Sequence, residues 1–121
     1  MGRDTLKLPS GAERDTSEGK PRYDLICAVS QRRLADHLGR GASKYSERNW
    51  EKGMPTSRSL ESALRHLHEY HKERTVGISP YEEEDHLAAV LFNVMALIRF
   101  ERTEHDDIET LSVPADNESF G

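Results

Sequence analysis

The stretch DHLAAVLFNVMALIRF, residues 85–100, decides the fold because it is the only long apolar run in a strongly polar chain. Its apolar side chains fall on every side of a helical wheel, so we expect a helix that other elements surround. Ser79, Pro80 and Glu82 precede the run and are typical of an N-cap, a first helical position and a capping box. The run is shorter than the roughly 20 apolar residues that cross a bilayer, so we expect no membrane-spanning segment.

Three polar residues, Glu82, His86 and Asn93, lie on one side of this predicted helix. At about 100° per residue they project within a few tens of degrees of one another. A polar group buried without a partner costs roughly 1–3 kcal/mol, and the alanines at 89 and 96 leave room beside this line. We interpret the line as a candidate binding site. Glu82 could instead be only a cap, and Asn93 a satisfied core amide.

Length and composition predict one small domain. The 121 residues carry a formal net charge of −5, with 35% hydrophobic and 32% charged residues. A helical core of this size gains burial by association, so we expect a homo-oligomer, a dimer or a tetramer. The single cysteine, Cys27, excludes an intrachain disulfide and suits a cytoplasmic protein. The acidic balance argues against general nucleic-acid binding.

The order of the segments predicts an all-α antiparallel helical bundle that oligomerisation completes. Residues 1–18 lack apolar periodicity and are expected to form a flexible arm. The helical domain is predicted over residues 19–102, with its first helix over about residues 30–45. Residues 103–121 are rich in Asp and Glu and are expected to form a mobile acidic tail.

A second helix is predicted from a cap at Thr56 or Ser57 to about Arg74. Its apolar residues recur at helical spacing and are expected to form its buried stripe: Leu60, Ala63, Leu64, Leu67 and Tyr70. Its polar flanks carry the residue types of a catalytic site. Together with His86 of the third helix, the expected catalytic residues are Glu61, Arg65, His66 and Glu69.

Two facing helices that both offer carboxylates and histidines predict a metal site. The candidate ligands are Glu61, Glu69, Glu82, Asp85 and His86. Carboxylate oxygens favour Mg²⁺ or Mn²⁺, and histidine together with carboxylate also admits Mn²⁺, Fe or Zn²⁺. Such an ion could bridge phosphate oxygens and activate water. Glu61 and Glu69 could instead be ordinary ion-pair partners of Arg65.

The segments that precede the helices carry the candidate substrate-binding residues. Lys20, Arg22, Lys44 and Arg65 could neutralise a phosphate chain, because charge-assisted hydrogen bonds are the strong ones. The loop after the first helix carries Tyr45, Asn49 and Trp50, which could stack on a flat ring and read its edge. Asn93 of the polar line is a further candidate for substrate binding. The tryptophan could equally be a packing anchor.

An ordered series of short motifs gives these segments a specific resemblance. The strings GKPRYDLI (19–26), GASKY (41–45), RNW (48–50), ALRHL (63–67) and HLAA (86–89) resemble the phage dATP/dGTP diphosphohydrolase (MazZ) family. The resemblance covers roughly residues 19–102 and implies an all-α, MazG-like nucleotide pyrophosphohydrolase. MazG-type enzymes hold Mg²⁺ with Glu-x-x-Glu on one helix and Glu-x-x-Asp on the next. Here Glu82-x-x-Asp85 matches the second pattern, one turn earlier than the alignment expects.

The function expected from this resemblance is metal-dependent hydrolysis of a purine deoxynucleoside triphosphate, dGTP in preference to dATP, to the monophosphate and pyrophosphate. The resemblance further implies a phage enzyme, working in the host cytoplasm, whose dGMP feeds the synthesis of a 2-aminoadenine nucleotide. A second class of function stays open from the residues alone. In that alternative the chain is a non-catalytic helical oligomerisation or nucleotide-sensing module.

Overall fold

The computed structural model describes residues 5–77 and 84–109 of the chain. A short antiparallel hairpin, β1 (Thr5–Lys7) and β2 (Glu13–Asp15), comes first and pairs Leu6 with Arg14. Three α-helices follow: α1 (Ala28–Lys44), α2 (Thr56–Val76) and α3 (His86–Phe100). Two single turns of 3₁₀ helix, η1 (Tyr23–Leu25) and η2 (Asn49–Lys52), precede α1 and α2. The predicted all-α bundle is therefore confirmed, and the hairpin gives the predicted arm local order.

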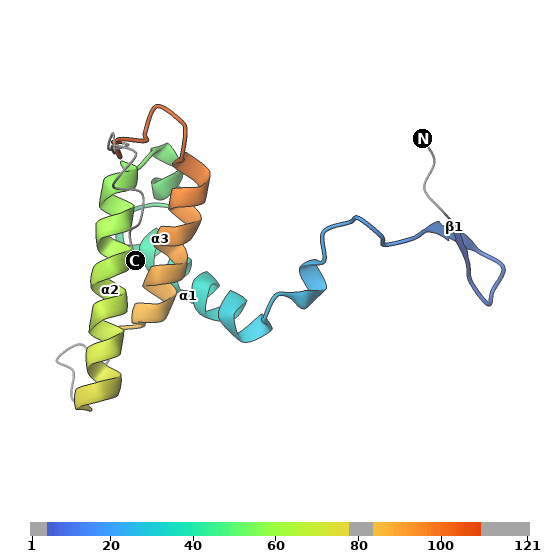
Figure 1. Cartoon of the computed structure of the whole chain (residues 1–121), viewed down its shortest axis with the longest axis horizontal. Helices are drawn as coiled ribbons and strands as arrows, with labels where there is room; N and C mark the ends of the chain where they lie inside the picture. The colour runs from blue at the N-terminus through green and yellow to red at the C-terminus, as the bar shows by residue number, and fades with distance from the viewer. Residues whose placement is uncertain (1–4, 78–83, 110–121) are drawn as a thin grey trace, which may run out of the picture.

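Helix α3 is the centre of the bundle. It runs antiparallel beside α2, and α1 crosses it on another side (Figure 1). The hairpin and the chain that links it to α1 extend away from the three helices (Figure 1). Ala88, Ala89 and Ala96 are buried on α3, and small side chains there let α2 approach closely.

The polar line predicted on α3 lies on its buried side. His86 and Asn93 are 3% and 5% exposed, in the same row as Ala89 and Ala96. The predicted start of this helix is corrected. The helix begins at His86, and the carboxylate of Asp85 caps it by accepting a hydrogen bond from the Ala88 N–H at 3.1 Å. Ser79, Pro80 and Glu82 lie outside the described residues.

The buried face of α2 differs from the prediction. Leu60, Leu64 and Leu67 are 39%, 61% and 48% exposed, and only Ala63 of the predicted stripe is buried. The face that meets α3 instead carries small and polar side chains: Thr56, Ser59, Ser62, His66 and Glu73. The leucines do recur at helical spacing. The buried polar row of α3 requires polar partners, however, so α2 meets it with its polar face and the leucines lie on the outer side. Leu91, Val94 and Ile98 of α3 are exposed as well, so one chain does not surround this helix.

The segment after α3 packs against the beginning of α2. Thr56, which is 1% exposed, donates its hydroxyl to Asp106 Oδ1 at 2.7 Å and accepts the Asp107 N–H at 3.2 Å. Asp107 accepts the Ser57 N–H at 2.8 Å, so a distant carboxylate supplies the cap predicted for Thr56 or Ser57. The His105 ring lies so close to Gly53 that any side chain at position 53 would collide with it. Residues 105–107 therefore contact the helical bundle.

Thr56→Val is expected to lower the free energy of unfolding by about 1.5–3 kcal/mol, because a buried hydroxyl that bonds a charged group is replaced by a methyl. Urea unfolding followed by circular dichroism measures the change. Thr75→Val is the matched control, since its hydroxyl lies on the exposed end of the same helix and bonds only backbone carbonyls. Equal losses in the two variants would contradict the cap described for α2.

Candidate active site

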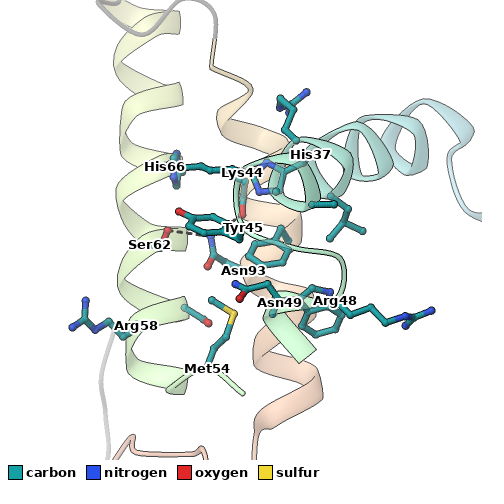
Figure 2. Close-up of a pocket in the computed structure, with 18 of the residues that line it drawn as sticks. His37, Lys44, Tyr45, Arg48, Asn49, Met54, Arg58, Ser62, His66 and Asn93 are labelled. Atoms are coloured by element: carbon teal, nitrogen blue, oxygen red, sulfur yellow. Dashed lines mark hydrogen bonds between the residues drawn. The ribbon is translucent and has the colours of Figure 1, made fainter. Parts of the chain in front are cut away.

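A pocket of about 790 Å³ lies between α1, α2, α3 and the loop that carries η2 (Figure 2). Its size suits a nucleotide-sized ligand. It brings together most of the predicted site residues from three helices and one loop: Lys44, Tyr45, Asn49, Trp50, Glu61, Arg65, His66 and Asn93. The α1 crossing and the η2 turn form one side, and the polar face of α2 forms the other (Figure 2).

Charged side chains surround the pocket where it meets solvent. Arg65 and Glu61, one turn apart on α2, form a 3.4 Å ion pair in which both side chains are more than half exposed. The ordinary i,i+4 pairing that the sequence left open for Glu61 is therefore present. Lys44 lies 5.2 Å from the centre of the Tyr45 ring, and Arg58 adds a further cation. Cations outnumber carboxylates among these groups, which favours an anionic ligand.

The apolar wall of the pocket is aromatic. The Trp50 ring meets Phe92 and Phe100 edge-on, with ring centres 6.1 and 6.0 Å apart. His37 of α1 lies 5.2 Å from Phe92 and also lines the pocket. Burial, reinforced by nearby Arg40, lowers the pKa of His37. Trp50 is thus both a packing anchor on α3 and part of the wall that a ligand would contact.

Asn93 places an amide inside the pocket. Its Nδ2 donates to Ser62 Oγ at 3.1 Å and to the Ala89 carbonyl at 2.8 Å. These two bonds use both amide hydrogens and fix the orientation of the group. The residue is 5% exposed, and its Oδ1 atom is the group that could accept a hydrogen bond from a ligand. A ligand N–H that reached it would form a hydrogen bond that water cannot easily replace.

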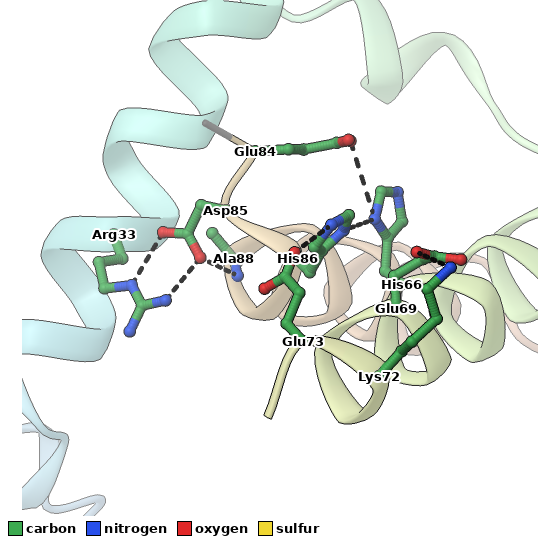
Figure 3. A network of polar contacts seen from close by, with 9 residues as sticks. All are labelled: Arg33, His66, Glu69, Lys72, Glu73, Glu84, Asp85, His86 and Ala88. Carbon is green, nitrogen blue, oxygen red and sulfur yellow. Dashed lines mark hydrogen bonds and ion pairs between the residues drawn. The ribbon is translucent and has the colours of Figure 1, made fainter. Parts of the chain in front are cut away.

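A histidine cluster lies at the edge of the pocket, where His66, which lines the pocket, meets His86 (Figure 3). His66 Nδ1 and His86 Nδ1 are 2.8 Å apart, and Glu84 Oε1 lies 3.8 Å from His66 Nδ1. Glu73 Oε1 is 3.0 Å from His86 Nε2 on the other side of that ring, although the pair is poorly aligned for a hydrogen bond. Burial is the main cause that lowers the pKa of His66, and the adjacent His86 adds to it while Glu84 opposes it. The lowered pKa favours the neutral form of the His66 ring.

The comparison with known protein families agrees with this geometry. The sequence model described as dATP/dGTP diphosphohydrolase, N-terminal, matches residues 10–109. The chain belongs to this family. The resemblance read from the short motifs is thereby confirmed, and the family description names the purine deoxynucleotides as substrates and diphosphohydrolysis as the activity. No curated protein and no solved structure gives a significant match to the chain.

The pocket of this diphosphohydrolase-family chain does not receive every predicted residue. Lys20 and Arg22 lie between the hairpin and α1 and do not line the pocket, and Arg22 pairs with Asp24 at 2.8 Å. Glu69 contacts Lys72 at 3.6 Å and does not line the pocket. His86 contacts His66 at the edge of the pocket. Glu82 lies outside the described residues, so its predicted metal role stays a prediction.

Asp85 is engaged in structural contacts rather than directed at the histidines. Arg33 of α1 donates to both of its oxygens, at 2.8 and 2.6 Å, and the same carboxylate caps α3 (Figure 3). Among the described residues, the predicted ligands Glu61, Glu69, Asp85 and His86 do not converge on one point. The set of donor atoms that does converge is His66, Glu84 and His86.

Asp85→Asn is expected to lower the free energy of unfolding near neutral pH by roughly 1–2 kcal/mol, with a discount for the exposure of Arg33. The Arg33 hydrogen bonds, with help from the Ala88 N–H, lower the pKa of Asp85 from 3.8 to about 2. Because the folded-state pKa is depressed, this stabilisation is complete above about pH 4 and is lost as the pH falls through about 2.

Urea unfolding of wild type and Asp85→Asn between about pH 6 and pH 2 measures this dependence. The difference between the two proteins should shrink as the pH falls. Asp36→Asn is the control, because Asp36 forms only an exposed pair with Arg32 at 3.2 Å. A difference that stayed constant over the whole range would contradict the ion pair with Arg33.

Several residues of the site were not predicted from the sequence. His37 of α1 and Ser62 of α2 line the pocket, and Glu73 and Glu84 surround the histidine pair. On α2, Ser62, His66 and Glu73 follow helical spacing, so a polar face was present in the sequence beside the leucine face. The sequence held no comparable spacing pattern for His37 or Glu84. The crossing of α1 over α3 positions His37, and the turn before α3 positions Glu84.

Proposed function

We propose that this chain hydrolyses a purine deoxynucleoside triphosphate between the α- and β-phosphates, with dGTP preferred and dATP as a second substrate. The observation that carries the proposal is the pocket itself. It joins an aromatic wall and a fixed amide to a cationic rim in a member of a diphosphohydrolase family. The products are the nucleoside monophosphate and pyrophosphate.

The purine ring is proposed to lie against Trp50, with its edge toward Asn93. Stacking on an aromatic face contributes roughly 1–3 kcal/mol and tolerates any base. Discrimination needs hydrogen bonds that the wrong ring cannot form. The Asn93 acceptor suits a ring N–H or an amino group, and Asn49 at the rim is the second candidate for reading the edge.

The triphosphate is proposed to extend toward the rim. Arg65 and Lys44 supply charge-assisted hydrogen bonds to phosphate oxygens, and Arg58 lies in the same rim. The Glu61 partner of Arg65 holds the guanidinium near the pocket before substrate arrives. Lys20 and Arg22 could act only if the arm reached a pocket, so their predicted role stays a prediction.

Mg²⁺ is the proposed cofactor, with Mn²⁺ as its replacement. Mg²⁺ usually binds through one or two carboxylates together with substrate phosphates, and Glu61, which lines the pocket beside Arg65, is a carboxylate that fits this pattern. A bound ion would offset phosphate charge and lower the pKa of an attacking water. The residues present therefore fit an ion that arrives with the nucleotide better than an all-protein cage.

Association of identical chains is part of the proposal. Leu60, Leu64, Val94 and Ile98 expose apolar surface on α2 and α3, and surfaces of this kind usually meet a partner. A dimer or tetramer would cover them. Among the described residues, no helix combines the length and the apolar character that crossing a membrane requires. The cytoplasmic location and the supply of dGMP for 2-aminoadenine nucleotide synthesis in a phage rest on the resemblance alone.

Incubation of the purified chain with each dNTP and Mg²⁺, followed by chromatography of the products, tests the proposal. We expect dGMP and pyrophosphate in equal amounts from dGTP, slower release from dATP, and little from pyrimidine substrates. Diphosphate and orthophosphate as products would contradict the position of cleavage. Saturable binding of dGTP without turnover would instead identify a nucleotide-sensing module.

A further inference from the structure

We propose that His66, His86 and Glu84 form a binding site for a first-row transition-metal ion of the Zn²⁺ type where α2 meets the start of α3. One donor atom from each of the three residues lies within 4.8 Å of the other two. The site is separate from the Mg²⁺ proposed to accompany the nucleotide. It uses different donor atoms, on the histidine side of the pocket, and Glu61 is not among them (Figure 3).

The short contact between the two rings shows how an ion could enter. At 2.8 Å, the two Nδ1 atoms share one proton, because one nitrogen must donate and the other accept. An ion bound at about 2.0–2.1 Å from each nitrogen would replace this proton, and the rings would separate by only about half an ångström. Neutral imidazole is the form that binds metals.

Glu73 orients the more deeply buried ring. Its Oε1 lies 3.0 Å from His86 Nε2, and the negative charge favours a proton on that nitrogen. The Nδ1 atom of His86 then presents its lone pair toward His66. A carboxylate behind a ligating histidine is the usual arrangement in metal sites, where it sets both the tautomer and the ring orientation.

The donor types select the ion. Two imidazole nitrogens and one carboxylate oxygen suit Zn²⁺, Co²⁺ or Ni²⁺, whereas Mg²⁺ prefers oxygen donors and retains its waters. Three protein ligands leave a fourth position for water. Glu84 is half exposed, so its carboxylate can turn toward the rings, and solvent has a path to the site.

The place of the site suggests what the ion would do. His66 lies on α2 one turn after Ser62, which bonds the Asn93 amide of α3. His86 begins α3, two turns before Asn93. An ion held by both histidines would therefore fasten the two helices that position the pocket amide, and it would stabilise the folded chain.

Titration of the full chain with Co²⁺, without nucleotide, tests this site, because tetrahedral Co²⁺ absorbs visible light and Zn²⁺ should displace it. We expect one ion bound per chain, an absorption that Mg²⁺ in large excess does not remove, and a higher melting temperature with Zn²⁺. No absorption and no calorimetric binding of Zn²⁺ would overturn the proposal. Neither readout depends on hydrolysis, so this result is separate from that of the nucleotide experiment.

Variants locate the site. His66→Gln and Glu84→Gln keep a polar side chain at partly exposed positions and should each weaken Co²⁺ binding at least tenfold. His86→Gln should also weaken Co²⁺ binding at least tenfold in protein that remains folded. His68→Gln and His71→Gln change exposed histidines of the same helix and should leave the affinity unchanged. Wild-type affinity in His66→Gln, or an equal loss in His68→Gln, would overturn the assignment.

Discussion

Glu61→Gln is expected to lower kcat for dGTP by at least about a hundredfold, because it removes the pocket carboxylate proposed to hold the ion that accompanies the triphosphate. The side chain is 73% exposed, so the melting temperature should change little. The pair with Arg65 lies in solvent and contributes little to folding. Steady-state assays of pyrophosphate release at saturating Mg²⁺ measure the effect.

Two controls make this result specific. Glu13→Gln removes an exposed carboxylate of the hairpin and should leave kcat unchanged. Raising the Mn²⁺ concentration should recover part of the Glu61→Gln activity, since a weakened ion site is filled by mass action. Wild-type kcat in Glu61→Gln would show that the ion is held elsewhere or that the reaction does not use this carboxylate.

Trp50→Ala is expected to lower the free energy of unfolding by about 3 kcal/mol, at the low end for removal of a large aromatic side chain because Trp50 is only half-buried. The ring supports Phe92 and Phe100 through edge-on contacts. In protein that remains folded, the affinity for dGTP and dATP should fall together. Urea unfolding and nucleotide titration at low temperature separate the two effects.

Trp50→Phe should recover most of the stability, because a smaller ring still contacts α3. Tyr45→Ala is the matched control, since Tyr45 belongs to the same loop but is 64% exposed. It should leave stability unchanged and act only on binding. If Trp50→Ala kept full stability, the aromatic cluster would not anchor the loop.

The central helix could be predicted because its signal is local. Residues 86–100 are apolar on all sides, and a single helix accounts for the whole run. His86 and Asn93 could be placed on one side from their spacing alone, and both are buried there. The start of the helix was harder to predict. Ser79 and Asp85 are both residue types that cap helices, and the sequence favoured Ser79. In the structure the carboxylate of Asp85 caps α3, and it also pairs with Arg33.

The face of α2 could not be chosen from the leucines alone. Leucine spacing shows which residues share a side, but it does not show whether that side meets the same chain or a partner. The polar row on α3 was the better guide. Once His86 and Asn93 are buried, their neighbours on α2 must supply donors and acceptors, and Ser62, His66 and Glu73 do so.

Contacts between segments far apart in the chain account for the remaining errors. The cap of α2 comes from Asp107, fifty residues after the Ser57 N–H that it accepts. Glu84 reaches His66 through the turn before α3. Neither partnership follows from periodicity or from a motif. Many of the predicted site residues lie together in the pocket, because the motifs that suggested them come from α2, from α3 and from the end of α1 with the loop after it, which meet there. Their roles stay predictions.

The most direct test of the pocket is its mapping by NMR with a dGTP analogue that carries a methylene bridge between the α- and β-phosphates. We expect a saturating concentration of the analogue to shift the NMR signals of Ser62, His66 and Asn93, together with that of the Trp50 indole N–H. Signals of the hairpin residues should stay in place. Shifts confined to the hairpin and the arm, with the pocket signals unchanged, would contradict the claim that this pocket binds the nucleotide.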